Sequence, residues 1–114
     1  MGSVLELDSW ILLKDGHRES RVITVGEIVR VVAVRNNMIV TARGEDTTVR
    51  GSLVKLYERL PKGFLSLGRS CVINMGHVAK VNALSRNLRF VMKDGTTHEV
   101  SRLRSRVIRK ELSL

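Results

Sequence analysis

Runs of apolar residues, many of them β-branched, dominate the first fifty positions and predict β-strands rather than helices. The clearest is 27–34, where Val and Ile fill five of eight positions, because β-branched side chains favour sheet over helix. Two turns separate such runs: Arg35-Asn36-Asn37, since Asn tolerates a positive φ, and Gly44-Glu45-Asp46. The predicted strands in this half are 4–13, 21–25, 27–34, 38–43 and 47–50.

One helix is clearly signalled in the middle of the chain. Ser52 is a good N-cap residue, and apolar residues follow it at the helical spacing i, i+3, i+4 and i+7. These four residues are Leu53, Leu56, Tyr57 and Leu60. Pro61 and Gly63 then predict the end of the helix.

The second half predicts further strands and a basic helix. Residues 64–74 form one strand-like run, in which Gly68 is expected to bend or bulge the strand and turn Arg69 out of an apolar face. On that face Cys71 is expected to be a packed core thiol beside Leu67 and Ile73. Further strands are predicted at 77–83, 88–92 and 97–100, with a turn at 93–95, and a helix at 101–112.

The last predicted helix has two unlike faces. On a helical wheel with Ser101 as the cap, Arg102, Arg106 and Arg109 fall within about 60° of one another, with Lys110 beside them. The opposite, packing face is expected to hold Leu103, Val107, Ile108 and Leu112. Arg104 falls on that apolar side, so either the helix frays or Arg104 has a partner within the protein.

Charge is distributed unevenly along the 114 residues, whose formal net charge is +9. Residues 1–58 hold eight Lys/Arg and eight Asp/Glu, whereas residues 59–114 hold twelve Lys/Arg and three Asp/Glu. A one-sided basic half suits a polyanion, because Lys and Arg displace the counterions condensed on nucleic acid. The alternative is a basic surface that serves solubility alone.

Other classes of protein are disfavoured by the same sequence. A single cysteine excludes an internal disulfide and fits a reducing, cytoplasmic compartment. No run approaches the ~18 apolar residues needed to span a bilayer, so no membrane partner is expected. Cys71 and the histidines lack metal-binding spacing, and no nucleophile with supporting groups or phosphate-binding glycine loop stands out. The chain is expected to be a non-enzyme without cofactors.

Several short motifs, taken together, resemble the LytTR DNA-binding domain, an output domain of bacterial transcription regulators. They are Phe64, Arg69-Ser70, Val72-Ile73-Asn74 with Met75-Gly76-His77-Val78 after it, Val100-Ser101-Arg102, and the Leu-rich helix entered at Gly51-Ser52-Leu53. The resemblance is strongest over residues 20–112. The chain, 1–114, is therefore interpreted as a single LytTR-like domain.

The resemblance implies a fold and a mode of binding. The fold would be mostly β, an elongated stack of antiparallel sheets with one or two short helices. Loops would enter successive major grooves at direct-repeat promoter sites, with two copies per site, and a receiver domain or signalling protein would be a further partner. The DNA-contact residues expected by matching position are Arg35, Asn36, Asn37, Arg69, Ser70, Ser101, Arg102, Arg104 and Arg106.

We therefore expect sequence-specific binding of double-stranded DNA by a transcription regulator. Arg and Asn suit guanine and adenine edges, while Ser and a helix terminus suit phosphates. Two alternatives stay open, an RNA-binding β module and a protein-interaction domain. The chain has only four aromatic residues, which are few for stacking RNA bases, so the first alternative is less favoured.

Overall fold

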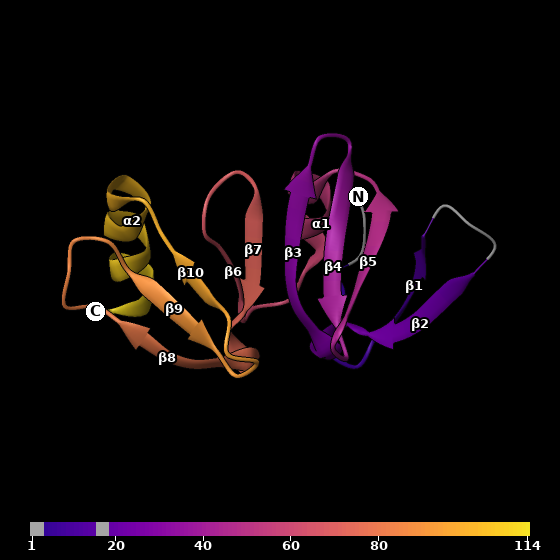
Figure 1. Ribbon diagram of the computed structural model, residues 1–114, viewed down its shortest axis with the longest axis horizontal. Helices are drawn as coiled ribbons and strands as arrows, with labels where there is room; N and C mark the ends of the chain where they lie inside the picture. The colour runs from indigo at the N-terminus through magenta and orange to yellow at the C-terminus, as the bar shows by residue number, and fades with distance from the viewer. Residues whose placement is uncertain (1–3, 16–18) are drawn as a thin grey trace. The chain divides into compact units, whose positions relative to one another are not determined.

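A computed structural model describes residues 4–15 and 19–114, and it confirms a mostly β protein (Figure 1). These residues form three antiparallel sheets, two α-helices and two short 3₁₀ turns. In chain order the elements are β1 (Trp10–Lys14), β2 (Ser20–Thr24), η1 (Val25–Glu27), β3 (Ile28–Val34), β4 (Asn37–Ala42), β5 (Glu45–Arg50), α1 (Leu53–Arg59), β6 (Phe64–Ser66), β7 (Cys71–Asn74), η2 (Met75–His77), β8 (Val78–Asn82), β9 (Arg89–Met92), β10 (Thr97–Glu99) and α2 (Arg102–Leu112).

The backbone divides into two compact units, residues 1–76 and 77–114. The first unit contains a five-stranded sheet in the order β5-β4-β3-β7-β6 and a separate β1–β2 ribbon. α1 lies behind β3, β4 and β5 in Figure 1. Two-residue turns join β3 to β4 and β4 to β5, as the register Val34↔Asn37 and Ala42↔Glu45 shows. The chain reverses near both predicted turns, but the turn residues are 35–36 and 43–44, because Asn37 already belongs to β4 and Glu45 to β5.

The core of the first unit lies on one face of the large sheet. The predicted amphipathic helix is confirmed, because Leu53 and Leu60 of its apolar stripe are buried there, and Leu56 and Tyr57 pack against the same cluster. The Ser52 side chain caps α1 by accepting a hydrogen bond from the Lys55 amide (3.4 Å). The cluster consists of Leu13, Ile23, Val25, Ile28, Val31, Met38, Val40, Ala42, Leu53, Leu60, Phe64 and Val72.

A buried amide side chain ties η1 and the start of β3 to Gly76 at the end of this unit. The Asn74 side chain, 4% exposed, donates to the carbonyls of Gly26 (3.2 Å) and Ile28 (2.9 Å). Its oxygen accepts a hydrogen bond from the Gly76 amide (2.9 Å). A buried side chain with all these bonds satisfied is expensive to replace, so Asn74 of the Val-Ile-Asn motif has a structural role.

The second unit packs α2 against a three-stranded sheet in the order β10-β9-β8. Its fully buried side chains include Leu88, Phe90, Met92 and Val100, with Ile108 from the helix. Ser105 is also fully buried. Its hydroxyl accepts from the Leu88 amide (2.9 Å) and donates to the Val100 carbonyl (3.3 Å), which fixes the helix on the sheet.

Three sequence-based expectations about these elements were wrong. The run 64–74 is not one bent strand but a hairpin, in which β6 pairs with β7 and the loop 67–70 reverses the chain. The first strand begins at Trp10 rather than Val4. Glu27 belongs to the turn η1 rather than to the strand after it, because its carboxylate accepts hydrogen bonds from the Thr24 amide (3.2 Å) and hydroxyl (2.7 Å).

The predicted packing face of α2 was also partly wrong. Leu103 and Val107 are 74% and 44% exposed, whereas Ser105 and Ile108 are the buried pair. A helical wheel could not show this, because the small Ser105 hydroxyl is drawn inward by two backbone partners. Neither α-helix of the described chain has the length and apolar character to cross a membrane.

Candidate nucleic-acid interface

The loops at one end of the five-stranded sheet bring three arginines together. This end carries the β3–β4 turn, the β6–β7 loop and the segment after β5. Together they line a hollow of about 450 Å³ that includes Arg35, Asn36, Arg50 and Arg69. We call these four residues the sheet-end cluster.

Backbone hydrogen bonds hold the loops of the sheet-end cluster in place. The Gly51 amide donates to the Asn36 carbonyl (3.2 Å), and the Ala33 amide donates to the Ser70 carbonyl (2.8 Å). Within the β6–β7 loop, the Ser66 hydroxyl donates to the Gly68 carbonyl (2.9 Å). The arginine side chains therefore project from a backbone that is already ordered, which lowers the entropy lost on binding.

Unusual backbone conformations shape two of these loops. Arg35 itself adopts the left-handed conformation (φ 57°), which is uncommon for any residue other than glycine, Asn or Asp. The asparagines had been expected to supply the positive φ, but Asn37 is already the first residue of β4. Gly68 has φ 151° and open space around the position of a Cβ atom. Gly68 lies in the loop that reverses the chain between β6 and β7 rather than at a bend within one strand, and Arg69 beside it is exposed, as expected.

A second group of arginines lies in the other unit, on α2 and the loop between β8 and β9. Arg86 from the loop and Arg102, Arg106 and Arg109 from the helix line a hollow of about 470 Å³. We call these four residues the helix cluster. The predicted basic face of the helix is thus confirmed, and the Ser101 side chain caps it by accepting from the Arg104 amide (3.3 Å).

Arg109 differs from its neighbours because its guanidinium is already engaged. It donates hydrogen bonds to the Ala83 carbonyl (3.1 Å) and to the Ser85 carbonyl, so it holds the β8–β9 loop against the helix. Arg104 is half-buried and has an interaction of its own within the protein. Ser70, Ser101, Arg102 and Arg106 are exposed.

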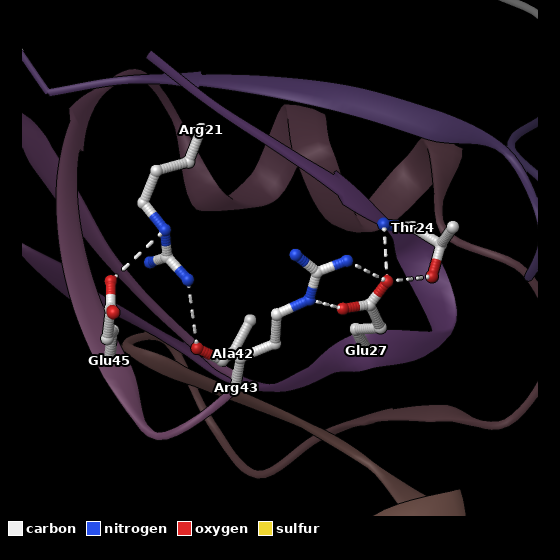
Figure 2. A network of polar contacts seen from close by, with 6 residues as sticks. All are labelled: Arg21, Thr24, Glu27, Ala42, Arg43 and Glu45. Carbon is white, nitrogen blue, oxygen red and sulfur yellow. Dashed lines mark hydrogen bonds and ion pairs between the residues drawn. The ribbon is translucent and has the colours of Figure 1, made fainter. Parts of the chain in front are cut away.

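The arginines of the chain separate into paired and unpaired groups. Figure 2 shows the paired kind: Arg21 contacts Glu45 (3.3 Å) and the Ala42 carbonyl (3.2 Å), and Arg43 bonds the Glu27 carboxylate. The hydrogen bond from Arg43 lowers the pKa of Glu27 to about 2. In the second unit Arg89 lies 3.6 Å from Glu99.

The two clusters contain the arginines whose side chains are unpaired. Within residues 4–15 and 19–114, no hydrogen bond or ion pair engages the side chains of six of their arginines. These are Arg35, Arg50, Arg69, Arg86, Arg102 and Arg106. Unpaired guanidinium groups gathered in a hollow suit an external anion such as phosphate.

Three cluster residues were absent from the expected DNA contacts: Arg109, which was predicted only as part of the basic helix face, and Arg50 and Arg86, which the sequence did not single out. Arg50 ends β5 and joins the sheet-end cluster because β5 and the β3–β4 turn finish at the same end of the sheet. Arg86 belongs to a loop whose Leu84 is 98% exposed. The stretch Leu84-Ser85-Arg86-Asn87 between two strands was the available signal, since an exposed loop with a cation and an amide is a typical contact segment.

Cys71 is only half-buried, so the expectation of a fully packed core thiol was wrong. It begins β7 directly after the exposed residues 68–70, where the sheet ends. Burial still raises the pKa of the thiol. Among the described residues no three His, Cys, Asp or Glu side chains gather as a metal site.

Comparison with known proteins decides the family. The sequence model of the LytTr DNA-binding domain matches residues 18–113. The chain belongs to the LytTR family. The domains of this family are DNA-binding domains of response regulators.

A solved structure agrees with the LytTR fold. It is described as the LytTr DNA-binding domain of a putative methyl-accepting/DNA response regulator from Bacillus cereus. The match has a TM-score of 0.83 at 22% identity and covers 93% of this chain and 98% of that chain. A comparison with curated protein sequences gave no match.

Proposed function

We propose that this LytTR chain, residues 1–114, is one functional domain that binds double-stranded DNA sequence-specifically in a transcription regulator. The observation that carries the proposal is the contrast between paired arginines, which hold the fold, and unpaired arginines, which gather in two hollows. The domain is not an enzyme in this proposal, and it acts in the cytoplasm, where promoter DNA lies.

The sheet-end cluster is proposed to read bases. Asn36 and Arg69 stand on narrow loops, where their side chains can enter a major groove and bond adenine and guanine edges. Asn37 and Ser70 flank them on the same loops. Order in these loops supports base reading, because a bidentate contact requires a fixed side-chain origin.

The helix cluster is proposed to bind phosphates. Ser101 and Arg102 begin α2, and Arg106 lies one turn further along the same face. Arginines in the first turn of a helix oppose its dipole, and an anion held there relieves the conflict. Arg104, which already interacts within the protein, contributes positive charge at this position.

Two copies are proposed to bind one promoter at direct repeats, with a receiver domain or signalling protein regulating them. An RNA-binding module is less well supported. Of the four aromatic side chains, Phe64 and Phe90 are buried and Tyr57 is half-buried. Only Trp10 is exposed, at 67%. A single exposed ring gives little surface for stacking successive bases.

The direct test is to select binding sites from a random duplex pool and then measure affinity against salt. About five or six phosphate contacts would give a log–log slope near −5, at roughly −0.9 per contact. Single-stranded DNA and RNA of the selected sequence serve as controls. A slope shallower than about −2, or equal affinity for selected and random duplexes, would contradict sequence-specific binding through these clusters.

A further inference from the structure

A second kind of hollow lies in the first unit, between the β1–β2 ribbon, the sheet and α1. Its volume is about 320 Å³, and its walls come from β1, β3, β4, β5, α1 and the segment before β1. Most of the lining is apolar and belongs to the core or packs against it. Apolar concavities of this size, with a few polar groups at the rim, are typical of small-molecule sites.

Among residues 4–15 and 19–114, all charged residues that line this hollow are cations. They are Lys14, Arg50 and Arg59, and no acidic residue of that part of the chain lines it. All three are exposed, and within residues 4–15 and 19–114 their side chains form no hydrogen bond or ion pair. An apolar cavity with cations at its rim complements a ligand with an apolar body and a single anionic group.

The wall of the hollow includes a segment outside the family match. The Leu5 amide donates to the Arg59 carbonyl (2.7 Å), which holds Leu5 at the end of α1. Leu5 is half-buried and lines the hollow together with Leu56 of α1. The segment before β1 and β1 itself, both outside residues 18–113 that the family model matches, thus supply part of the wall of this hollow.

We propose that this hollow binds a small amphipathic carboxylate, with its apolar body against Leu56 and Val49 and its carboxylate at the cationic rim. Burial of the ligand's apolar body supplies affinity, and the rim cations select an anion over a neutral or cationic analogue. Nothing in the DNA-binding role requires such a site. It would add a sensing function to the domain.

Arg50 connects this site to the proposed DNA contacts. It lines both the apolar hollow and the hollow of the sheet-end cluster. The two hollows are also adjacent, because the Cε of Met38, which lines the apolar hollow, would lie 2.9 Å from a Cβ added at Gly51, which lines the other. A carboxylate that pairs with Arg50 therefore withdraws a cation from the sheet-end cluster. This regulatory step rests on the proposed function.

The first experiment measures binding of decanoate to the full chain by calorimetry, below its micellar concentration. Decan-1-ol is the neutral probe of equal chain length. Arg59→Gln should weaken decanoate binding about fivefold, as expected for a partly exposed ion pair, whereas Lys62→Gln, a cation outside the hollow, should leave it unchanged. Leu56→Trp should fill the hollow and reduce binding roughly tenfold or more. If Leu56→Trp fails to fold, the difference in decanoate affinity between Arg59→Gln and Lys62→Gln still tests the site.

The second experiment measures duplex affinity with and without saturating decanoate. We expect a loss of about threefold to tenfold, comparable to removing one cationic contact, and no effect of decanoate on Arg50→Gln. Absence of decanoate binding, or equal binding of decan-1-ol, would overturn the carboxylate site. Decanoate binding that leaves DNA affinity unchanged would overturn the link through Arg50. A chain that binds decanoate but no duplex would refute the proposed function and leave the site standing.

Discussion

The two arginine clusters present similar charge on different supports. The sheet-end cluster stands on tight loops with unusual backbone angles, such as φ 57° at Arg35 and 151° at Gly68. The helix cluster stands on a regular helix and on one loop that Arg109 holds in place. Narrow loops fix the direction of a few side chains, which suits base edges, whereas a helix face repeats cations along a line, which suits phosphates.

Each unit also contains a buried polar side chain that joins separate segments of its backbone. Asn74 joins Gly26 and Ile28 to Gly76 in the first unit, and Ser105 fixes α2 on the sheet of the second. Asn74 forms three hydrogen bonds and Ser105 forms two. The first unit should therefore depend more strongly on its polar side chain than the second does.

The largest expected effect is on stability in the first unit. Asn74→Leu should lower the free energy of unfolding by about 2–4 kcal/mol, because it leaves two carbonyls and one amide without partners. Urea denaturation followed by circular dichroism measures it. Ser105→Ala is the matched change in the second unit and should cost less, about 1–2 kcal/mol. Equal losses would break the contrast between the units.

The next largest effect separates base reading from phosphate binding. Arg69→Ala should weaken binding to the selected duplex by about 1–3 kcal/mol and relax selectivity at one base position. Fluorescence anisotropy on matched and scrambled duplexes measures both. Lys62→Ala, another exposed cation of the same unit, is the control. An equal loss on both duplexes would place Arg69 among phosphate contacts.

A smaller and uniform effect is expected in the helix cluster. Arg106→Ala should weaken matched and scrambled duplexes about equally and flatten the salt slope by about one. Arg89→Ala removes the same charge from the same unit, but Arg89 is paired with Glu99, so it should change the slope less. Arg109 is a poorer test because its loss would also release the β8–β9 loop. The idea of a phosphate-binding helix fails if Arg106→Ala alters base preference.

The smallest effect concerns the paired arginines. The pKa of Glu27 is about 2 when folded, against 4.5 unperturbed, mainly because Arg43 bonds its carboxylate. Protonation therefore favours the unfolded chain, so this stabilisation is complete above pH ~4.5 and is lost as the pH falls towards ~2. Glu27→Gln should flatten stability in that window and leave duplex affinity at neutral pH unchanged. An affinity change would show that Arg43 is more than a structural partner.

The local features of the fold were predictable from the sequence. Ser52 and Ser101 indicated both helix starts, and β-branched runs with turn residues indicated most strands, because caps, turns and β-propensity act over a few neighbouring residues. The surface position of Arg69 beside Gly68 followed in the same way, although the chain reverses there instead of bending within one strand.

Tertiary structure decided which residues act together. In the sequence Arg21 and Arg50 are equivalent cations between β-rich neighbours. In the structure the separate β1–β2 ribbon brings Arg21 to Glu45 and Thr47 of β5, whereas Arg50 lies at the end of the sheet. Likewise, Ser105 was buried and Leu103 exposed because Leu88 and Val100 supplied backbone partners for the hydroxyl. Pairing and burial depend on contacts between distant segments, which periodicity within one segment does not encode.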